Sequence, residues 1–310
     1  MKSLAPIIIF SYNRRETIEK LIISLLKNKE SKNSNLYIFQ DNHKNIYDKN
    51  KVEDVKKYIR HIKGFKKIKI YYRSINFGLS KNIIEGIKLV FSKHNKAIFL
   101  EDDLIVSDQF LEFMNKCLNF YYKKKKIWHI SGWNYDINIK NNNYDAFIIR
   151  NTNSWGWATW KDRWKYFSKD PEKIVKTWES NYITKFNLDN VYDFFLQIKK
   201  NYLKISDTWG IFWYATVFVN KGLCIYPKNS LVNNIGFGKF ATNTKVKQFF
   251  FENTIDCKKN NIRLPKKLIE NKLFLEAIKN LITKRRSLLY KTYMYIKKKT
   301  EKYVQIFFAI

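Results

Sequence analysis

The first hundred residues alternate short apolar runs with segments whose apolar residues recur at helical spacing. That alternation is typical of a parallel sheet whose strands are joined by crossover helices. We expect strands over residues 7–10, 36–39, 68–72 and 97–100, and helices over residues 16–26, 52–59 and 80–90. Ligands of open α/β sheets bind beyond the carboxyl ends of the strands. The sequence therefore predicts an α/β fold with a ligand site at one edge of its sheet.

The pattern changes after residue 105. A helix is expected over residues 110–122, and short strands with loops rich in Trp, Gly and Asn follow to about residue 165. The chain has 310 residues, of which 45% are hydrophobic, and no Pro-, Gly- or Ser-rich linker divides it. These features indicate one large domain with appended segments.

The formal net charge of +32, from 59 basic and 27 acidic residues, invites an anionic partner. The chain is also rich in Asn and Ile, so biased codon usage explains part of that charge. There is no Arg-rich arm and no zinc-finger spacing, and we expect no nucleic-acid partner.

Cys117, Cys224 and Cys257 lack metal-ligand spacing and are interpreted as reduced thiols. The apolar run at residues 7–10 is too short to span a membrane, which favours a cytoplasmic protein.

Three carboxylates, Glu101, Asp102 and Asp103, follow the fourth strand directly. Strand alternation would direct Glu101 and Asp103 to one face and Asp102 to the other. Clustered carboxylates raise each other's pKa unless a cation neutralises them, and hard oxygen ligands suit Mn²⁺ or Mg²⁺. A solvated acidic turn is the alternative. Three consecutive acids in so basic a chain favour a metal site.

Several blocks occur in the order in which the GT-A glycosyltransferases carry them. The chain resembles N-acetylglucosaminyltransferase I and related bacterial, family-2-like sugar transferases over roughly residues 5 to 240. The resemblance rests on residues 6–14 (PIIIFSYNR), 39–41 (FQD), 76–80 (NFGLS), 100–104 (LEDDL), 128–134 (WHISGWN), 154–160 (SWGWATW) and 207–209 (DTW).

The resemblance implies a GT-A, Rossmann-like fold with a mixed central sheet. It implies metal-dependent, inverting transfer of a sugar from a nucleotide diphosphate donor, UDP favoured, to a hydroxyl of a glycan or lipid-linked glycan in cell-surface glycan synthesis. The expected catalytic domain covers residues 1–250, with a nucleotide-sugar half to about residue 105 and an acceptor half over 106–250. A basic helical tail would follow over 251–310.

The resemblance also assigns roles to the residues of the donor side. Asp103 would be the direct metal ligand, with Glu101 supporting it, and Asp102 would contact the ribose. The remaining donor residues implied are Tyr12, Asn13, Arg14, Asp41, Ser80 and Lys81. The Arg14 guanidinium could bind phosphate oxygens; the alternative is a solvated side chain at a helix start. The Asp41 carboxylate could accept a hydrogen bond from the imide N–H of uracil; the alternative is an aspartate in a turn.

On the acceptor side, the resemblance implies a sugar pocket and a base. The pocket would be shaped by Trp133, Trp155, Gly156 and Trp157. Asp207 would remove the proton of the acceptor hydroxyl. The alternative for Asp207 is a helix N-cap, because it precedes an apolar run. Residues 239–243 depart from the related bacterial loop, since Asn243 stands near an expected His.

The end of the chain is strongly basic. Residues 258–310 contain 15 Lys and Arg against three Glu, with apolar residues at roughly helical intervals. Such a helix suits an anionic membrane surface, and we expect peripheral binding to the inner face of the plasma membrane. Packing on the catalytic domain or on a second subunit is the alternative.

Two other function classes stay open at this point. A sugar-phosphate nucleotidyltransferase would share the fold and the metal carboxylates. It ranks second, because residues 11–15 contain no glycine. A basic nucleic-acid-binding protein would not need an acidic triplet at a strand end.

Overall fold

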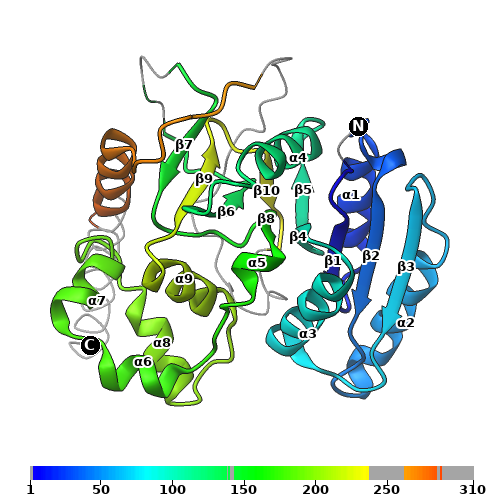
Figure 1. Cartoon of the computed structure of the whole chain (residues 1–310). Helices are drawn as coiled ribbons and strands as arrows, with labels where there is room; N and C mark the ends of the chain where they lie inside the picture. Colours follow the sequence, from blue (N-terminus) through cyan, green and yellow to red (C-terminus); the bar gives the residue numbers. More distant parts are fainter. Residues whose placement is uncertain (1–2, 138, 140–142, 237–261, 285–286, 288–310) are drawn as a thin grey trace, which may run out of the picture.

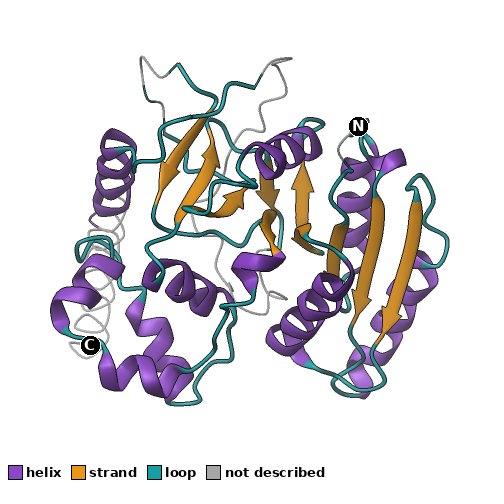
Figure 2. Cartoon of the chain, in the orientation of Figure 1, coloured by secondary structure: helices purple, strands orange, loops and turns teal. Residues whose placement is uncertain are grey.

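A computed structural model describes residues 3–137, 139, 143–236, 262–284 and 287. Its centre is one mixed sheet of eight strands in the order β3-β2-β1-β4-β8-β6-β9-β7, with a separate pair formed by β5 and β10 (Figures 1 and 2). The predicted α/β class with a mixed central sheet is confirmed.

The first part of the chain builds the parallel side of the sheet. Strands β1, β2, β3 and β4 pair in parallel in the order β3-β2-β1-β4. Helices α1, α2 and α3 surround them on the right of Figure 1. The bounds are β1 Ile7–Ser11, α1 Arg15–Leu26, the 3₁₀ helix Ser31–Asn33, β2 Asn35–Gln40, α2 Ile46–Ile59, β3 Lys67–Tyr72, α3 Gly78–Lys93 and β4 Lys96–Glu101.

The second part adds β8, antiparallel to both β4 and β6, and then β9 and β7. Helices α6 to α9 gather at the lower left of Figure 1. The bounds are β5 Leu104–Val106, α4 Phe110–Phe120, β6 Ile127–Ser131, β7 Ala146–Ile149, β8 Trp157–Trp160, α5 Lys161–Trp164, α6 Pro171–Thr177, α7 Ser180–Phe186, α8 Phe195–Tyr202, α9 Gly210–Val219, β9 Leu223–Pro227 and β10 Val232–Asn234.

Hydrophobic periodicity explains the early elements. Every residue of β1 is buried, as expected for a strand covered on both faces. In α1 the buried apolar residues are Ile18, Leu21, Ile22 and Leu25, which is the spacing of one helix face. The predicted strands and helices of the first hundred residues are confirmed, although α2 begins at Ile46 and not near Val52 as expected.

Strand pairing brings distant segments to one edge of the sheet. Ser11 pairs with Gln40 and Gln40 with Tyr72, while Phe10 pairs with Glu101, so the carboxyl ends of β1 to β4 meet. Because β8 runs antiparallel, the residues just before Trp157 lie at the same edge. The Gly132 N–H donates to the Gly156 carbonyl at 2.6 Å, which adds the end of β6. Most of the sequence blocks are therefore gathered at one edge.

Residues 262–284 pack on the sheet, although the sequence placed them in a separate tail. The ring of Phe274 stacks on Phe147 of β7 with centroids 4.1 Å apart, and Ile278 is fully buried. The Asn271 N–H donates to the Ile148 carbonyl at 2.7 Å. Packing on the domain is therefore the correct alternative for this segment. The expected membrane contact of residues beyond 287 lies outside the described residues.

This packing predicts a difference between two neighbours on one helix. Phe274 is fully buried, whereas Leu273 is 73% exposed. Phe274→Ala should lower the free energy of unfolding by about 3–5 kcal/mol, and Leu273→Ala should change it by less than about 0.5 kcal/mol. Equal, small shifts in denaturant midpoint for both variants would show that the segment does not belong to the body of the fold.

Within the described residues, no helix is both long enough and apolar enough to cross a membrane.

Candidate active site

The acidic triplet at the end of β4 meets the arginine that follows β1. Arg14 reaches Asp102 through Nη2–Oδ1 at 2.5 Å and Asp103 through Nη1–Oδ2 at 2.8 Å. Burial lowers the pKa of Arg14, but the two carboxylates outweigh it and raise that pKa above its usual value. The expected division of Asp102 and Asp103 between opposite faces is wrong, because β4 ends at Glu101 and the next two residues form a turn. Contact of Arg14 with phosphate stays a prediction, since its Nη1 and Nη2 atoms already bind carboxylates.

The carboxylates of the triplet carry more negative charge than Arg14 neutralises, so a further cation could bind. One guanidinium faces three carboxylates, and burial, followed by repulsion from Asp103, raises the pKa of Glu101 to about 8. Burial and the neighbouring carboxylate also raise the pKa of Asp102, although Arg14 opposes this. Carboxylates in such a site are protonated or bind a cation.

Asp103 supplies the oxygen that a cation would need. Its Oδ1 is buried and has no hydrogen-bond partner among the described residues. The chain near β10 closes over it: the Ile235 N–H donates to the Asp103 carbonyl at 2.8 Å, and a Cβ on Gly236 would lie 1.9 Å from Asp103 Oδ2. Only glycine fits there. The described residues hold no group of three His, Cys, Asp or Glu that could bind a metal by itself. Asp103 Oδ1 could therefore bind a metal ion that has a single protein ligand.

The loop that carries Arg14 is fixed by an aspartate of α2. Asp48 accepts from Tyr12 Oη at 2.9 Å and from Asn13 Nδ2 at 2.9 Å. Burial, with a contribution from Asp48, raises the pKa of Tyr12 to about 12. The Tyr12 N–H donates to Asp102 Oδ2 at 3.0 Å, so the same loop also orients the acidic turn.

Asp41, after β2, holds the start of α3. Its carboxylate accepts from the N–H groups of Phe77 at 2.8 Å, Gly78 at 2.9 Å and Asn42 at 2.9 Å. Burial raises the pKa of Asp41, although these three bonds oppose it. Two N–H groups at the amino end of α3 are therefore occupied by Asp41. A contact between Asp41 and a nucleotide base stays a prediction.

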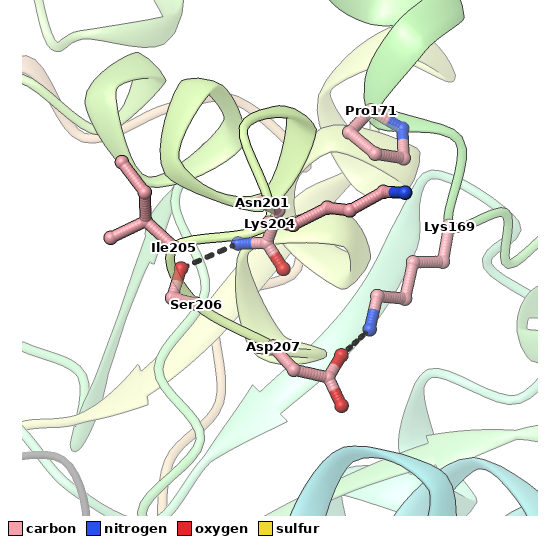
Figure 3. Close-up of a pocket in the computed structure, with 7 residues that line it drawn as sticks. All are labelled: Lys169, Pro171, Asn201, Lys204, Ile205, Ser206 and Asp207. Carbon is pink, nitrogen blue, oxygen red and sulfur yellow. Dashed lines mark hydrogen bonds and ion pairs between the residues drawn. The ribbon is translucent and has the colours of Figure 1, made fainter.

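A lysine that sequence reasoning missed joins Ser80 to Asp207. Lys169 Nζ donates to Ser80 Oγ at 2.9 Å and forms an ion pair with Asp207 Oδ1 (Figure 3). Ser80 is buried, while the Asp207 side chain is 69% exposed. Lys81, by contrast, is exposed and places its ammonium 4.4 Å from the Phe77 ring centroid.

Asp207 is not the cap of the helix that follows it. Helix α9 begins at Gly210, and its N-cap is Trp209, whose side chain makes no capping hydrogen bond. The capping alternative is therefore wrong, and the loop around Asp207 is held differently. Asn201 of α8 donates to Thr208 Oγ1 at 2.9 Å and accepts from the Thr208 N–H at 2.9 Å.

A pocket of about 470 Å³ opens beside Asp207 (Figure 3). Lys204 enters it from a left-handed backbone with φ of +57°, a conformation uncommon for a residue other than glycine. The pocket is lined by Lys169, Pro171, Asn201, Lys204, Ile205, Ser206 and Asp207.

The expected sugar pocket needs correction. Trp133 is fully buried and Trp157 is 2% exposed, so neither presents a ring face to a ligand. Trp157 instead packs in the core, 4.6 Å from the Phe99 centroid. Gly156 has φ of +60°, and a Cβ there would lie 2.8 Å from Val232 Cγ2, so core packing explains the glycine. Trp155 is half-buried and is the member of this set that can contact a sugar.

Four residues important to this geometry were missed by sequence reasoning: Asp48, Lys169, Asn201 and Gly236. Lys169 is one of 59 basic residues, and nothing local distinguishes it. Gly236 lies outside the sequence blocks that carry the resemblance. Asp48 acts through the distant residues Tyr12 and Asn13. Asn201 acts through Thr208 in a neighbouring loop. A single sequence does not reveal such contacts.

Comparison with known proteins adds one clear match. Residues 7–120 match the family model described as glycosyl transferase family 2. A search of curated proteins finds no significant match.

Solved structures give looser likenesses. S. aureus TarS 1-349 is 12% identical, with 52% of this chain and 48% of that chain aligned at a TM-score of 0.37. TarS 1-349 in complex with UDP-GlcNAc is 15% identical over 52% of this chain and 46% of that one, also at 0.37. The chain thus spans about half the length of these proteins, and the superpositions are too loose to carry an argument about substrate.

The family match covers the strands and loops that present Arg14, Asp41, Ser80 and the acidic triplet. Residues 7–120 are therefore similar to glycosyl transferase family 2 domains, and they lie in an α/β fold with a mixed central sheet.

Proposed function

We propose that the protein is a metal-dependent, inverting glycosyltransferase that moves a sugar from a nucleotide diphosphate donor, UDP favoured, to an acceptor hydroxyl. The observation that carries this proposal is Asp103. One of its oxygens is held by Arg14, while the other is buried and lacks a partner among the described residues. That arrangement lies at the carboxyl edge of the parallel strands, where nucleotides bind in such folds.

The donor would be held by the residues gathered at that edge. Tyr12 and Asn13, fixed by Asp48, would contact the nucleoside, together with Asp41. Asp102 would contact the ribose. Ser80 and Lys81, in the first turn of α3, would lie near the diphosphate, because a helix amino end favours anions.

Mn²⁺ or Mg²⁺ would be bound through Asp103 Oδ1, with Glu101 as a supporting group. Such an ion, when bound, neutralises charge on the departing diphosphate. Arg14 keeps Asp102 and Asp103 in place and supplies a fixed positive charge beside them. The burial of this site strengthens these electrostatic effects.

Asp207 would act as the catalytic base. Its carboxylate would accept the proton of the acceptor hydroxyl as that oxygen forms its bond to the anomeric carbon. The bond from that carbon to the diphosphate oxygen breaks in the same displacement, so the configuration inverts. Asp207 is exposed at the rim of the pocket, where an acceptor can reach it, and Trp155 would contact a sugar ring.

The acceptor would be a glycan or lipid-linked glycan used in cell-surface synthesis. The basic residues near the end of the chain would attract an anionic membrane, with the protein at the inner face of the plasma membrane in the cytoplasm. This part of the proposal rests on charge alone.

Nucleotide binding tests the proposal before the acceptor is known. UDP with Mn²⁺ should raise the melting temperature, because a ligand at about 100 times its dissociation constant stabilises the folded state by about 2.7 kcal/mol. The shift should vanish when a chelator replaces Mn²⁺. No stabilisation by UDP or another nucleoside diphosphate, with any divalent ion, would refute the proposal.

A further inference from the structure

Lys169 links the two sides of the candidate site through one ammonium group. It precedes α6, yet it bonds to Ser80 in the first turn of α3 and to Asp207 in the loop before α9. Figure 3 shows the contact with Asp207. Ser80 and Asp207 lie 89 and 38 positions from Lys169 along the chain. Among the described contacts, this is the direct link between the predicted donor helix and the predicted base.

The contact conflicts with the role of Asp207 in the free protein. A carboxylate oxygen that binds an ammonium is not available to take a proton from an acceptor. In Figure 3 the other oxygen of Asp207 points away from Lys169. The pair is not needed to hold the fold, because an ion pair with a 69% exposed partner contributes little stability.

The place of Lys169 suggests a second partner. Its ammonium lies within hydrogen-bond distance of Ser80, at the amino end of α3, which is the position expected for the donor's phosphates. An ammonium has three donors, and two are used here. A diphosphate carries more negative charge than one carboxylate and would compete for the same cation.

We propose that Lys169 binds the diphosphate of the donor, and that this binding releases Asp207. In the free protein Lys169 occupies Asp207, and in the donor complex it turns to phosphate oxygens while keeping its place beside Ser80. The Asp207 oxygen that binds Lys169 is thus freed only when the donor is present. This inference rests on the proposed function, because it requires a nucleoside diphosphate at this edge of the sheet.

A double-mutant cycle on UDP binding in Mn²⁺ tests the inference, measured by calorimetry on the full chain. Lys169→Met should weaken UDP about tenfold to a hundredfold, the usual worth of a charge-assisted hydrogen bond. Asp207→Asn should tighten UDP about twofold to fivefold, because Lys169 no longer has to leave a carboxylate. In the Lys169→Met background, Asp207→Asn should leave UDP affinity unchanged.

Two controls isolate the phosphates. Uridine has no phosphate, so its affinity should not respond to either substitution. Lys173→Met removes the same charge from an exposed position on α6 outside the pocket, and UDP affinity should change by less than about twofold.

Unchanged UDP affinity in Lys169→Met would overturn the inference. Equal tightening by Asp207→Asn in both backgrounds would also overturn it, because the effect would then be general repulsion. If the wild-type protein binds UDP but the variants give either of these results, the inference is wrong and the proposed function stands. Wild-type protein that binds no nucleoside diphosphate overturns both.

Discussion

Asp207→Asn should reduce the rate of sugar transfer by a factor of roughly 10² to 10⁴ while the protein stays folded and binds UDP at least as tightly as wild type. The amide matches the carboxylate in size but cannot accept the acceptor proton, and removal of a general base has an effect of this order. The exposed side chain caps no helix, so the melting temperature should hardly change. Steady-state rates with saturating donor check the prediction.

A matched substitution separates the base from a nearby charge. Asp170 caps α6 by accepting from the Lys173 N–H at 2.9 Å, and asparagine can take over that cap. Asp170→Asn should therefore keep the transfer rate within about twofold. Near-normal transfer by Asp207→Asn, or an equal loss in both variants, would remove Asp207 from the role of base.

Asp103→Asn should abolish the stabilisation by UDP that depends on Mn²⁺, and with it sugar transfer. The amide oxygen can still accept from Arg14, but the NH₂ group then stands where Oδ1 would bind the ion. The site loses its direct ligand while the local hydrogen bonds are kept. Thermal shifts with UDP, measured with Mn²⁺ and with chelator, check this.

Asp54→Asn is the control, because it removes one exposed carboxylate of α2 and should leave the shift intact. A variant Asp103→Asn that still responds to UDP and Mn²⁺ as wild type does would show that another group binds the ion.

The sequence predicted the parallel side of the sheet well because its signals are local. Strands β1 and β4 are apolar runs, and helices α1 and α3 each have a regular apolar face. The position of the acidic triplet at a strand end follows from the same pattern. Its geometry did not follow, because the turn at Asp102 and Asp103 is set by Arg14, 88 and 89 positions away.

The acceptor side was harder for a physical reason. Tryptophan serves both sugar contacts and cores, and only packing decides between them. Trp157 lies between Phe99 and Trp209, with centroid separations of 4.6 and 5.3 Å, and is core. Likewise, Phe274 and Ile278 have the spacing of a membrane-binding helix, yet Phe274 stacks on Phe147 of β7 and Ile278 is fully buried. Periodicity defines an apolar face but does not identify the surface that covers it.

Glycosyl transfer itself can be tested without knowledge of the acceptor, since water can replace it slowly. NMR spectra recorded during hydrolysis of a UDP-α-sugar in Mn²⁺ report the anomer of the free sugar before it mutarotates. The account predicts that the β-anomer appears first, that a chelator prevents its formation, and that Asp207→Asn slows it. If the α-anomer appears first, or if Asp207→Asn releases sugar at the wild-type rate, a single displacement with Asp207 as base is contradicted.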